Sequence, residues 1–197
     1  MMNKLEFYYD CSSPWTYLAF EQVCRLGDAL EISWKPILVG GIFNSINPSV
    51  YAARENPIQA KLNYAQKDLQ DWAKALNVQI GSPSVFPVNS AKAMRGAFVA
   101  AEESKLVMYS RLIFKAYWED DEDISQLPIL KSVVEALQLN WEDFATKIES
   151  PRYKGLLRQN TDELIDRGGF GSPTYFLNGS DMFFGNDRID LMLKKIL

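Results

Sequence analysis

The chain has 197 residues, of which 47% are hydrophobic and 23% are charged, and its net charge is −4. This composition is typical of a folded chain with a core, and the acidic balance argues against nucleic acid or an anionic membrane as the main partner. No apolar run approaches the roughly 18 residues that a membrane-spanning helix needs, and the N-terminus lacks the apolar segment of a signal peptide. We therefore expect a cytoplasmic protein.

The first forty residues have a β-α-β pattern. Leu5 to Tyr9 is a short β-rich run, and Pro14 to Leu26 follows with the apolar spacing of a helix that ends at Gly27. Glu31 to Leu38 predicts a second strand, in which Pro36 favours an edge position or the strand end.

The middle of the chain is predicted to be helical after a loop. The stretch GGIFNSINPS, residues 40–49, is rich in glycine, asparagine and proline and is typical of a loop. Ile58 to Leu76 then has apolar residues at spacings of three and four, which predicts a long helix. Five further helices are expected with little strand signal between them: Ser90 to Glu103, Lys105 to Trp118, Leu127 to Leu137, Trp141 to Ile148 and Arg152 to Arg167.

The C-terminal thirty residues return to strand signals. Thr174 to Leu177 and Met182 to Phe184 flank an Asn-Gly dipeptide, which favours a hairpin, and a last helix is expected from about Asp187. The order β-α-β, helical block, β-β-α is that of a thioredoxin-like fold with an insertion. We predict an α/β protein with a thioredoxin-like domain from residues 1–40 and 168–197 and an all-helical insertion domain from residues 41–167.

The composition restricts the chemistry. Histidine is absent, which excludes serine–histidine–acid triads and histidine-ligated zinc. Cys11 and Cys24 would lie roughly 15 Å apart along the first helix, too far for a disulfide. We expect Cys11 to be a small buried side chain, although it is near enough to the predicted site to be oxidised. No metal site is expected, because the acidic run at 119–123 lacks the spacing of a calcium-binding loop. Without histidine or a cysteine pair, we expect a bound molecule to supply the reactive group if the protein is an enzyme.

The motif Ser13-Pro14-Trp15-Thr16 begins the first helix and has two interpretations. A serine before a proline is a common helix N-cap, which needs no further explanation. The same helix terminus also favours a bound anion, and the Ser13 hydroxyl is suited to donate a hydrogen bond to a thiolate brought from outside. Thioredoxin-like proteins carry a Cys-x-x-Cys pair here, so this chain is not expected to exchange disulfides.

Two further motifs also have a structural and a functional interpretation. Pro173 is either an ordinary strand start or a cis-proline that turns the backbone of Ser172 toward a ligand. Asn186 and Asp187 either cap the last helix or receive the ammonium and carboxylate groups of a ligand.

Together these motifs resemble the family of 2-hydroxychromene-2-carboxylate isomerases and kappa-class glutathione transferases. The resemblance runs nearly end to end. It rests on Phe7-Tyr8-Tyr9-Asp10, Ser13 to Leu18, Gly40 to Phe43, Lys61 with Tyr64, Phe86 to Ser90 with Arg95, Gly171 to Thr174, and Phe184 to Arg188.

The resemblance implies glutathione as cofactor or cosubstrate. Ser13 matches the serine that holds the glutathione thiolate, and Ser172, just before Pro173, matches the residue whose backbone pairs with the cysteinyl part. The other matching positions are Asn186 and Asp187 for the γ-glutamyl part, Lys61 near the glycyl carboxylate, Asn47 in the preceding loop, and Arg188 with no assigned role.

The resemblance also implies an activity. We expect a glutathione-dependent isomerase in which the thiolate adds reversibly to a conjugated, small aromatic substrate, with Trp15, Phe43, Phe86 and Asn89 in the substrate pocket. A kappa-like transferase or peroxidase uses the same site and is the nearer alternative, and a non-enzymatic thioredoxin-fold binding protein is the second. A homodimer and a role in aromatic degradation follow from the family alone.

Overall fold

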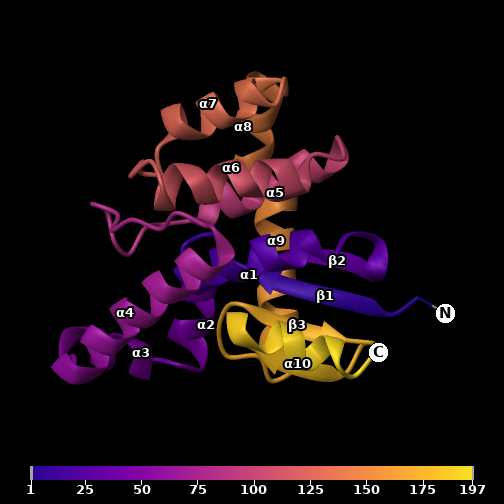
Figure 1. Ribbon diagram of the computed structural model, residues 1–197. Coiled ribbons are helices and arrows are strands. Elements are labelled where there is room, and N and C mark those ends of the chain that lie inside the picture. Colours follow the sequence, from indigo (N-terminus) through magenta and orange to yellow (C-terminus); the bar gives the residue numbers. More distant parts are fainter. Residues whose placement is uncertain (1, 197) are drawn as a thin grey trace.

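The protein, as a computed structural model, is described over residues 2–196 and contains a four-stranded mixed sheet. The strands are β1 (Lys4–Tyr9), β2 (Glu31–Pro36), β3 (Thr174–Leu177) and β4 (Asp181–Phe184), in the order β2-β1-β3-β4. β1 runs parallel to β2 and antiparallel to β3, and β3 and β4 form the predicted hairpin. The two ends of the chain therefore pair in one sheet, as Figure 1 shows.

Helices form most of the rest of the chain, and nearly all predicted helices are confirmed within two residues. They are α1 (Pro14–Arg25), α2 (Val39–Ser45), α3 (Ser49–Glu55), α4 (Gln59–Leu76), α5 (Ala91–Glu102), α6 (Leu106–Trp118), α7 (Leu127–Ala136), α8 (Trp141–Glu149), α9 (Pro151–Asp166) and α10 (Ile189–Leu193). Short 3₁₀ turns cover Gly27–Ala29 and Asn186–Arg188, so the last helix begins with a 3₁₀ turn. None of the helices within 2–196 is long and apolar enough to cross a membrane.

The loop predicted over residues 40–49 is wrong, because α2 and α3 occupy most of this segment. No side chain of its own caps α2; instead, the Val39 amide donates to Oδ2 of Asp10 at 2.8 Å. The preceding Leu38 amide donates to Oγ1 of Thr161 at 3.0 Å. The amides at the start of this helix are therefore hydrogen-bonded to the residue that follows β1 and to a residue of α9, both far away in the sequence.

The two faces of the sheet pack against different helices. Leu5, Phe7 and Tyr9 alternate along β1 and lie in the main core with residues of α1 and α6. Tyr8 points to the opposite face, where it packs with Phe176 and with residues of α2 and α9. How the chain divides into the domains 1–40 with 168–197 and 41–167 stays a prediction.

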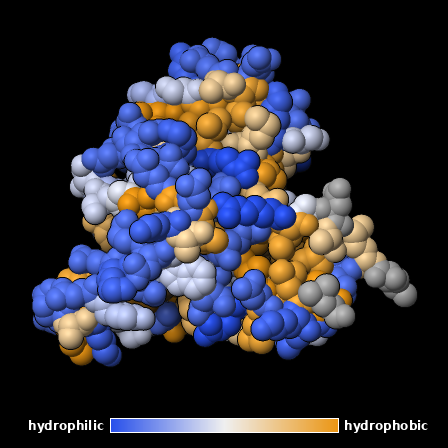
Figure 2. All heavy atoms as spheres, in the orientation of Figure 1, coloured by the Kyte–Doolittle hydropathy of each residue, from blue (hydrophilic) through white to orange (hydrophobic). Residues whose placement is uncertain are grey.

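α3 and α4 form an arm that extends from the rest of the molecule (Figure 1). Ala73, near the C-terminal end of α4, is the only fully buried residue of that helix, and Leu62 and Tyr64 are exposed. The predicted apolar stripe is therefore covered only toward Leu76, whose carbonyl accepts from Arg25 on α1 at 2.5 Å. In the view of Figure 2 the surface of the arm is mainly hydrophilic.

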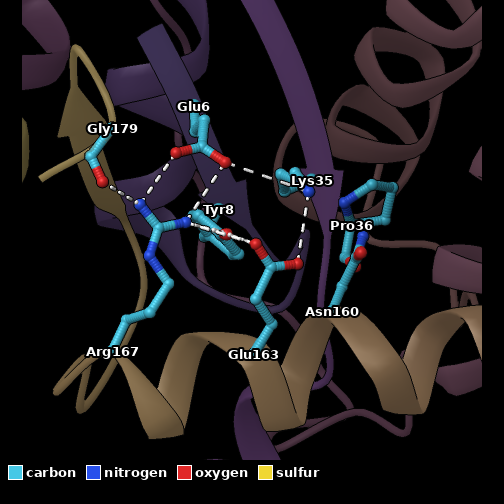
Figure 3. A network of polar contacts seen from close by, with 8 residues as sticks. All are labelled: Glu6, Tyr8, Lys35, Pro36, Asn160, Glu163, Arg167 and Gly179. Carbon is cyan, nitrogen blue, oxygen red and sulfur yellow. Dashed lines mark hydrogen bonds and ion pairs between the residues drawn. The ribbon is translucent and has the colours of Figure 1, made fainter.

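A network of charged side chains attaches α9 to the sheet (Figure 3). Arg167 donates to both carboxylate oxygens of Glu6, at 3.1 and 2.8 Å, and to the hydroxyl of Tyr8 at 2.6 Å. Glu163 accepts from Tyr8 at 2.7 Å and from Lys35 at 3.2 Å. Two acidic and two basic groups thus balance one another between β1, β2 and α9.

Candidate functional site

A cavity of about 710 Å³ lies where the start of α1, the α2–α3 segment, the 77–90 segment and the turn before β3 meet. Most of its lining is apolar or aromatic, and serine and asparagine side chains supply polar groups. Seven of the predicted site residues line it: Ser13, Trp15, Phe43, Asn47, Phe86, Asn89 and Ser172.

Ser13 is the N-cap of α1, as the sequence predicts. Its backbone is extended (φ −107°, ψ 124°), so the helix begins at Pro14, and its Oγ accepts from the Thr16 amide at 3.3 Å. The Ser13 hydroxyl donates to the carbonyl of Ser172 at 3.4 Å. Because this contact is long, it is weak, and the hydroxyl proton lies at the cavity wall with little competition from the protein.

Ser172 joins the two halves of the thioredoxin-like region at the site. Its Oγ accepts from the Asp10 amide at 3.1 Å and shares a hydrogen bond of 2.8 Å with Oγ1 of Thr16. The peptide bond between Ser172 and Pro173 is cis, as predicted. The Ser172 side chain is therefore fixed against β1 and α1, and its carbonyl oxygen is held beside the Ser13 hydroxyl.

The carboxylate of Asp10 lies buried behind the site and was not assigned a role from the sequence. It accepts from the Ser12 amide at 2.9 Å, from the Val39 amide at 2.8 Å and from Oγ of Ser90 at 3.0 Å. Burial raises the pKa of Asp10, and these hydrogen bonds oppose that rise. One side chain thus connects the Ser12–Ser13 turn, α2 and the start of α5, which form three walls of the cavity.

The α2–α3 segment supplies a wall that the sequence only partly predicts. Asn47 donates from Nδ2 to the carbonyl of Phe170 at 3.2 Å, and Phe43 packs edge to face with Tyr51. Tyr51 and Arg54 of α3 also line the cavity. The sequence pattern does not reveal these two residues, because residues 40–49 are typical of a loop and the residues before Ile58 have no clear helical spacing.

Five predicted site residues do not line this cavity. Lys61 is exposed on the first turn of α4, and Pro173 is buried next to Ser172 in the chain. The others form the 3₁₀ turn Asn186–Arg188, which packs against α1, where Gln22 donates to the carbonyl of Asn186 at 3.1 Å. Asn186 is buried and its Nδ2 has no hydrogen-bond partner among the described residues, whereas Asp187 and Arg188 pair with each other at the surface.

Cys11 is a core residue. It is 1% exposed, its amide donates to Sδ of Met94, and its carbonyl accepts from Nε1 of Trp118 at 2.8 Å. Burial raises the pKa of the Cys11 thiol well above its ordinary value. Cys11 and Cys24 are both free, so the predicted small buried side chain agrees with the structure, and the thiol is not activated for attack.

The family model described as a DSBA-like thioredoxin domain matches residues 4–197. A 2-hydroxychromene-2-carboxylate isomerase from Pseudomonas sp. (strain C18) is 30% identical, with 95% of this chain and 87% of the relative covered. Glutathione S-transferase kappa 1 from Rattus norvegicus is 28% identical, with 95% and 88% covered. A solved structure of 2-hydroxychromene-2-carboxylate isomerase matches with a TM-score of 0.82 at 25% identity, over 98% of this chain and 93% of that one. The predicted thioredoxin-like α/β fold is confirmed.

Proposed function

The chain belongs to the DSBA-like thioredoxin domain family, on the branch of 2-hydroxychromene-2-carboxylate isomerases and kappa glutathione S-transferases, and we propose that it is a glutathione-dependent isomerase. Relatives over nearly the whole chain are named as isomerases and kappa glutathione S-transferases, and this is the family that the sequence motifs predict. We place the isomerase before the transferase because the two isomerases from Pseudomonas are 29% and 30% identical. A third isomerase, from Sphingobium xenophagum, is 24% identical, and the kappa transferases are 24–28% identical.

The hydroxyl of Ser13 carries the proposal. Its Oγ already accepts from the Thr16 amide, so its proton is free to be donated. Within residues 2–196 its one acceptor is the Ser172 carbonyl, 3.4 Å away. A thiolate placed between the start of α1 and Ser172 would be a stronger acceptor, because it carries a full charge.

The available energy matches what thiol activation requires. A thiol with a pKa of about 8.5 is only about 3% ionised at pH 7, and lowering the pKa by about two units requires roughly 2.7 kcal/mol. A hydrogen bond to a charged acceptor supplies about 1.5–3 kcal/mol, and the N-terminus of a helix adds about 0.3–1 kcal/mol. Ser13 at the start of α1 is therefore sufficient without a general base.

The chemistry of the donor set fits glutathione. The Ser13 hydroxyl suits its thiol, the Ser172 backbone suits its cysteinyl amide, and the unpartnered Nδ2 of buried Asn186 is a spare donor beside Asp187 for the γ-glutamyl part. When bound, glutathione supplies a thiolate that adds reversibly to a conjugated double bond of the substrate. The aromatic walls at Trp15 and Phe43 would orient the substrate and exclude water.

A titration of thiolate ultraviolet absorbance, with glutathione mixed with the protein, tests the proposal. We expect the pKa of bound glutathione to be about two units lower with the wild type and with Ser12→Ala, and most of this shift to be lost in Ser13→Ala. Ser12 is the matched control because it also lines the cavity but does not cap α1.

Turnover of 2-hydroxychromene-2-carboxylate separates the isomerase from a transferase with the same site. We expect glutathione-dependent conversion that falls by about 10- to 100-fold in Ser13→Ala, since about 1.4–2.7 kcal/mol of stabilisation is removed. An unshifted thiol pKa would refute the glutathione site. A shifted pKa without conversion would leave the thiolate site and refute the isomerase activity.

A further inference from the structure

Arg54 differs from the other arginines of the chain. Each of the others hydrogen-bonds or pairs with a protein oxygen, as Arg25 does with a carbonyl and Arg111 with a carboxylate. The guanidinium of Arg54 has no such partner within residues 2–196, although Glu55 is its neighbour in the chain. All five of its N–H donors are therefore left for water or a ligand.

Arg54 is exposed, and its guanidinium lies beside two aromatic rings of the cavity. Its central carbon lies 5.6 Å from the ring centroid of Phe43 on α2 and 5.3 Å from that of Phe86 in the 77–90 segment. Both distances are in the range of a cation–π interaction, which acts through the face of the guanidinium and leaves its N–H edges available. Arg54 thus bridges two walls of the cavity and presents donors to it.

The cavity has no other formal charge. Among the described residues that line it, Arg54 is the only charged one, and most of the others are aromatic, aliphatic or glycine. A planar ring fits among such walls, and a carboxylate fits the fork of a guanidinium with two parallel hydrogen bonds. A neutral planar ligand would pack against the apolar walls but would not form the paired hydrogen bonds with the guanidinium.

We propose that Arg54 is a specificity-determining residue that binds the carboxylate of a planar aromatic or conjugated ligand in this cavity. The proposal rests on the proposed function, whose substrate already carries a carboxylate, and deepens it by naming the residue that binds this group. A carboxylate at Arg54 has two possible sources, the substrate and glutathione. We assign it to the substrate, because the guanidinium lies over Phe43 and Phe86, which form the apolar wall of the cavity. The proposed glutathione contacts at Ser13 and Ser172 belong to other segments of the chain.

Calorimetric binding of two matched probes without glutathione tests the proposal. 2-Naphthoate carries the carboxylate, and 2-naphthalenemethanol is its neutral counterpart. We expect the wild type to bind the naphthoate at least tenfold more tightly. Arg54→Met, which keeps the length of the side chain, should remove this preference, and Arg54→Lys should retain part of it because the charge remains without the fork.

A matched arginine and a glutathione titration complete the test. Arg158→Met removes an exposed arginine far along the chain on α9 and should bind both probes as the wild type does. Glutathione affinity should be the same in Arg54→Met and the wild type. If Arg54→Met does not fold, Arg54→Gln is scored by the same criterion.

Three results would overturn the proposal. The first is a wild type without preference for the naphthoate, including one that binds neither probe. The second is a preference that survives in Arg54→Met. The third is a loss of glutathione affinity in Arg54→Met with unchanged naphthoate binding, which would assign the carboxylate to glutathione. Because the probe arms contain no glutathione, their result is independent of the thiol titration that tests the proposed function.

Discussion

The charges of Glu6, Lys35, Glu163 and Arg167 balance one another on one face of the sheet, whereas Asp10, at the end of β1, is a single buried carboxylate. The four charged groups remain partly exposed, with side-chain exposures of 23–33%, and Asp10 is fully buried. Neutral donors surround Asp10, namely two backbone amides and one hydroxyl.

The difference reflects what each cluster holds together. Ion pairs between a helix and a sheet tolerate small shifts because water completes their hydrogen bonds. A buried carboxylate with three donors is satisfied only when all its neighbours are in place, since an unpaired buried polar group is costly. We infer that the charged network fastens α9 to the sheet and that Asp10 fixes the relative positions of the cavity walls.

The largest expected effect comes from Asp10→Ala. It leaves the buried Val39 amide and the partly buried Ser12 amide without an acceptor, and an unsatisfied buried amide costs about 1–3 kcal/mol. We expect the free energy of unfolding in urea to fall by at least about 2 kcal/mol, with smaller losses in Asp10→Asn, which keeps one acceptor oxygen. A loss below about 0.5 kcal/mol, which is ordinary for a surface site, would contradict the role of Asp10.

Arg167→Met should have an intermediate effect. It removes the donors to Glu6, Glu163, Tyr8 and the Gly179 carbonyl, and leaves the two carboxylates with Lys35. Because these groups reach water, we expect a loss of about 1–2 kcal/mol in the same urea experiment. Arg158→Met is the control, because its pair with Asp162 is exposed and should contribute less than about 0.5 kcal/mol. Equal losses in the two variants would mean that the network adds nothing beyond a surface pair.

The smallest effects are expected from two opposite pH dependences, because each is only the pH-dependent part of one carboxyl group's contribution to stability. Burial raises the pKa of Asp10, so its contribution is greatest at low pH and is lost as the pH rises through the folded-state pKa. Burial would also raise the pKa of Glu163, but hydrogen bonds from Tyr8 and Lys35 outweigh it and lower that pKa. The contribution of Glu163 is therefore present near neutral pH and is lost as the pH falls below about 4.5.

Urea unfolding from pH 3.5 to 7.5 measures the direction in which each contribution to stability changes with pH. The difference in stability between the wild type and Asp10→Asn should move in favour of the wild type as the pH falls. The difference between the wild type and Glu163→Gln should move against the wild type below about pH 4.5. Two differences that change in the same direction would show that one of these carboxyl groups is not perturbed as its surroundings suggest.

The sequence predicts the sheet and most helices because their signals are local. The apolar alternation of β1, the serine and proline at the start of α1, and the Asn-Gly turn before β4 each act within a few residues. Ser13 and Ser172 were found in the same way, because each stands before a proline where an element begins. Phe43 and Phe86, which also line the cavity, were implied by the resemblance to a known family. α2 was missed because its glycines and asparagines favour a loop unless a distant group caps the helix.

By itself, the amino-acid sequence determined the four strands, most of the helices and the residue at which α1 begins. It also determined the absence of histidine and of a cysteine pair, which leaves a serine hydroxyl as the candidate for thiol activation. Only the tertiary structure decided that Asp10 caps a helix 29 residues away and that the arm at α3 brings Arg54 between two aromatic rings. The reason is physical. A helix start or a hairpin depends on neighbours along the chain, whereas a buried carboxylate and an unpaired guanidinium take their roles from groups that only folding brings together.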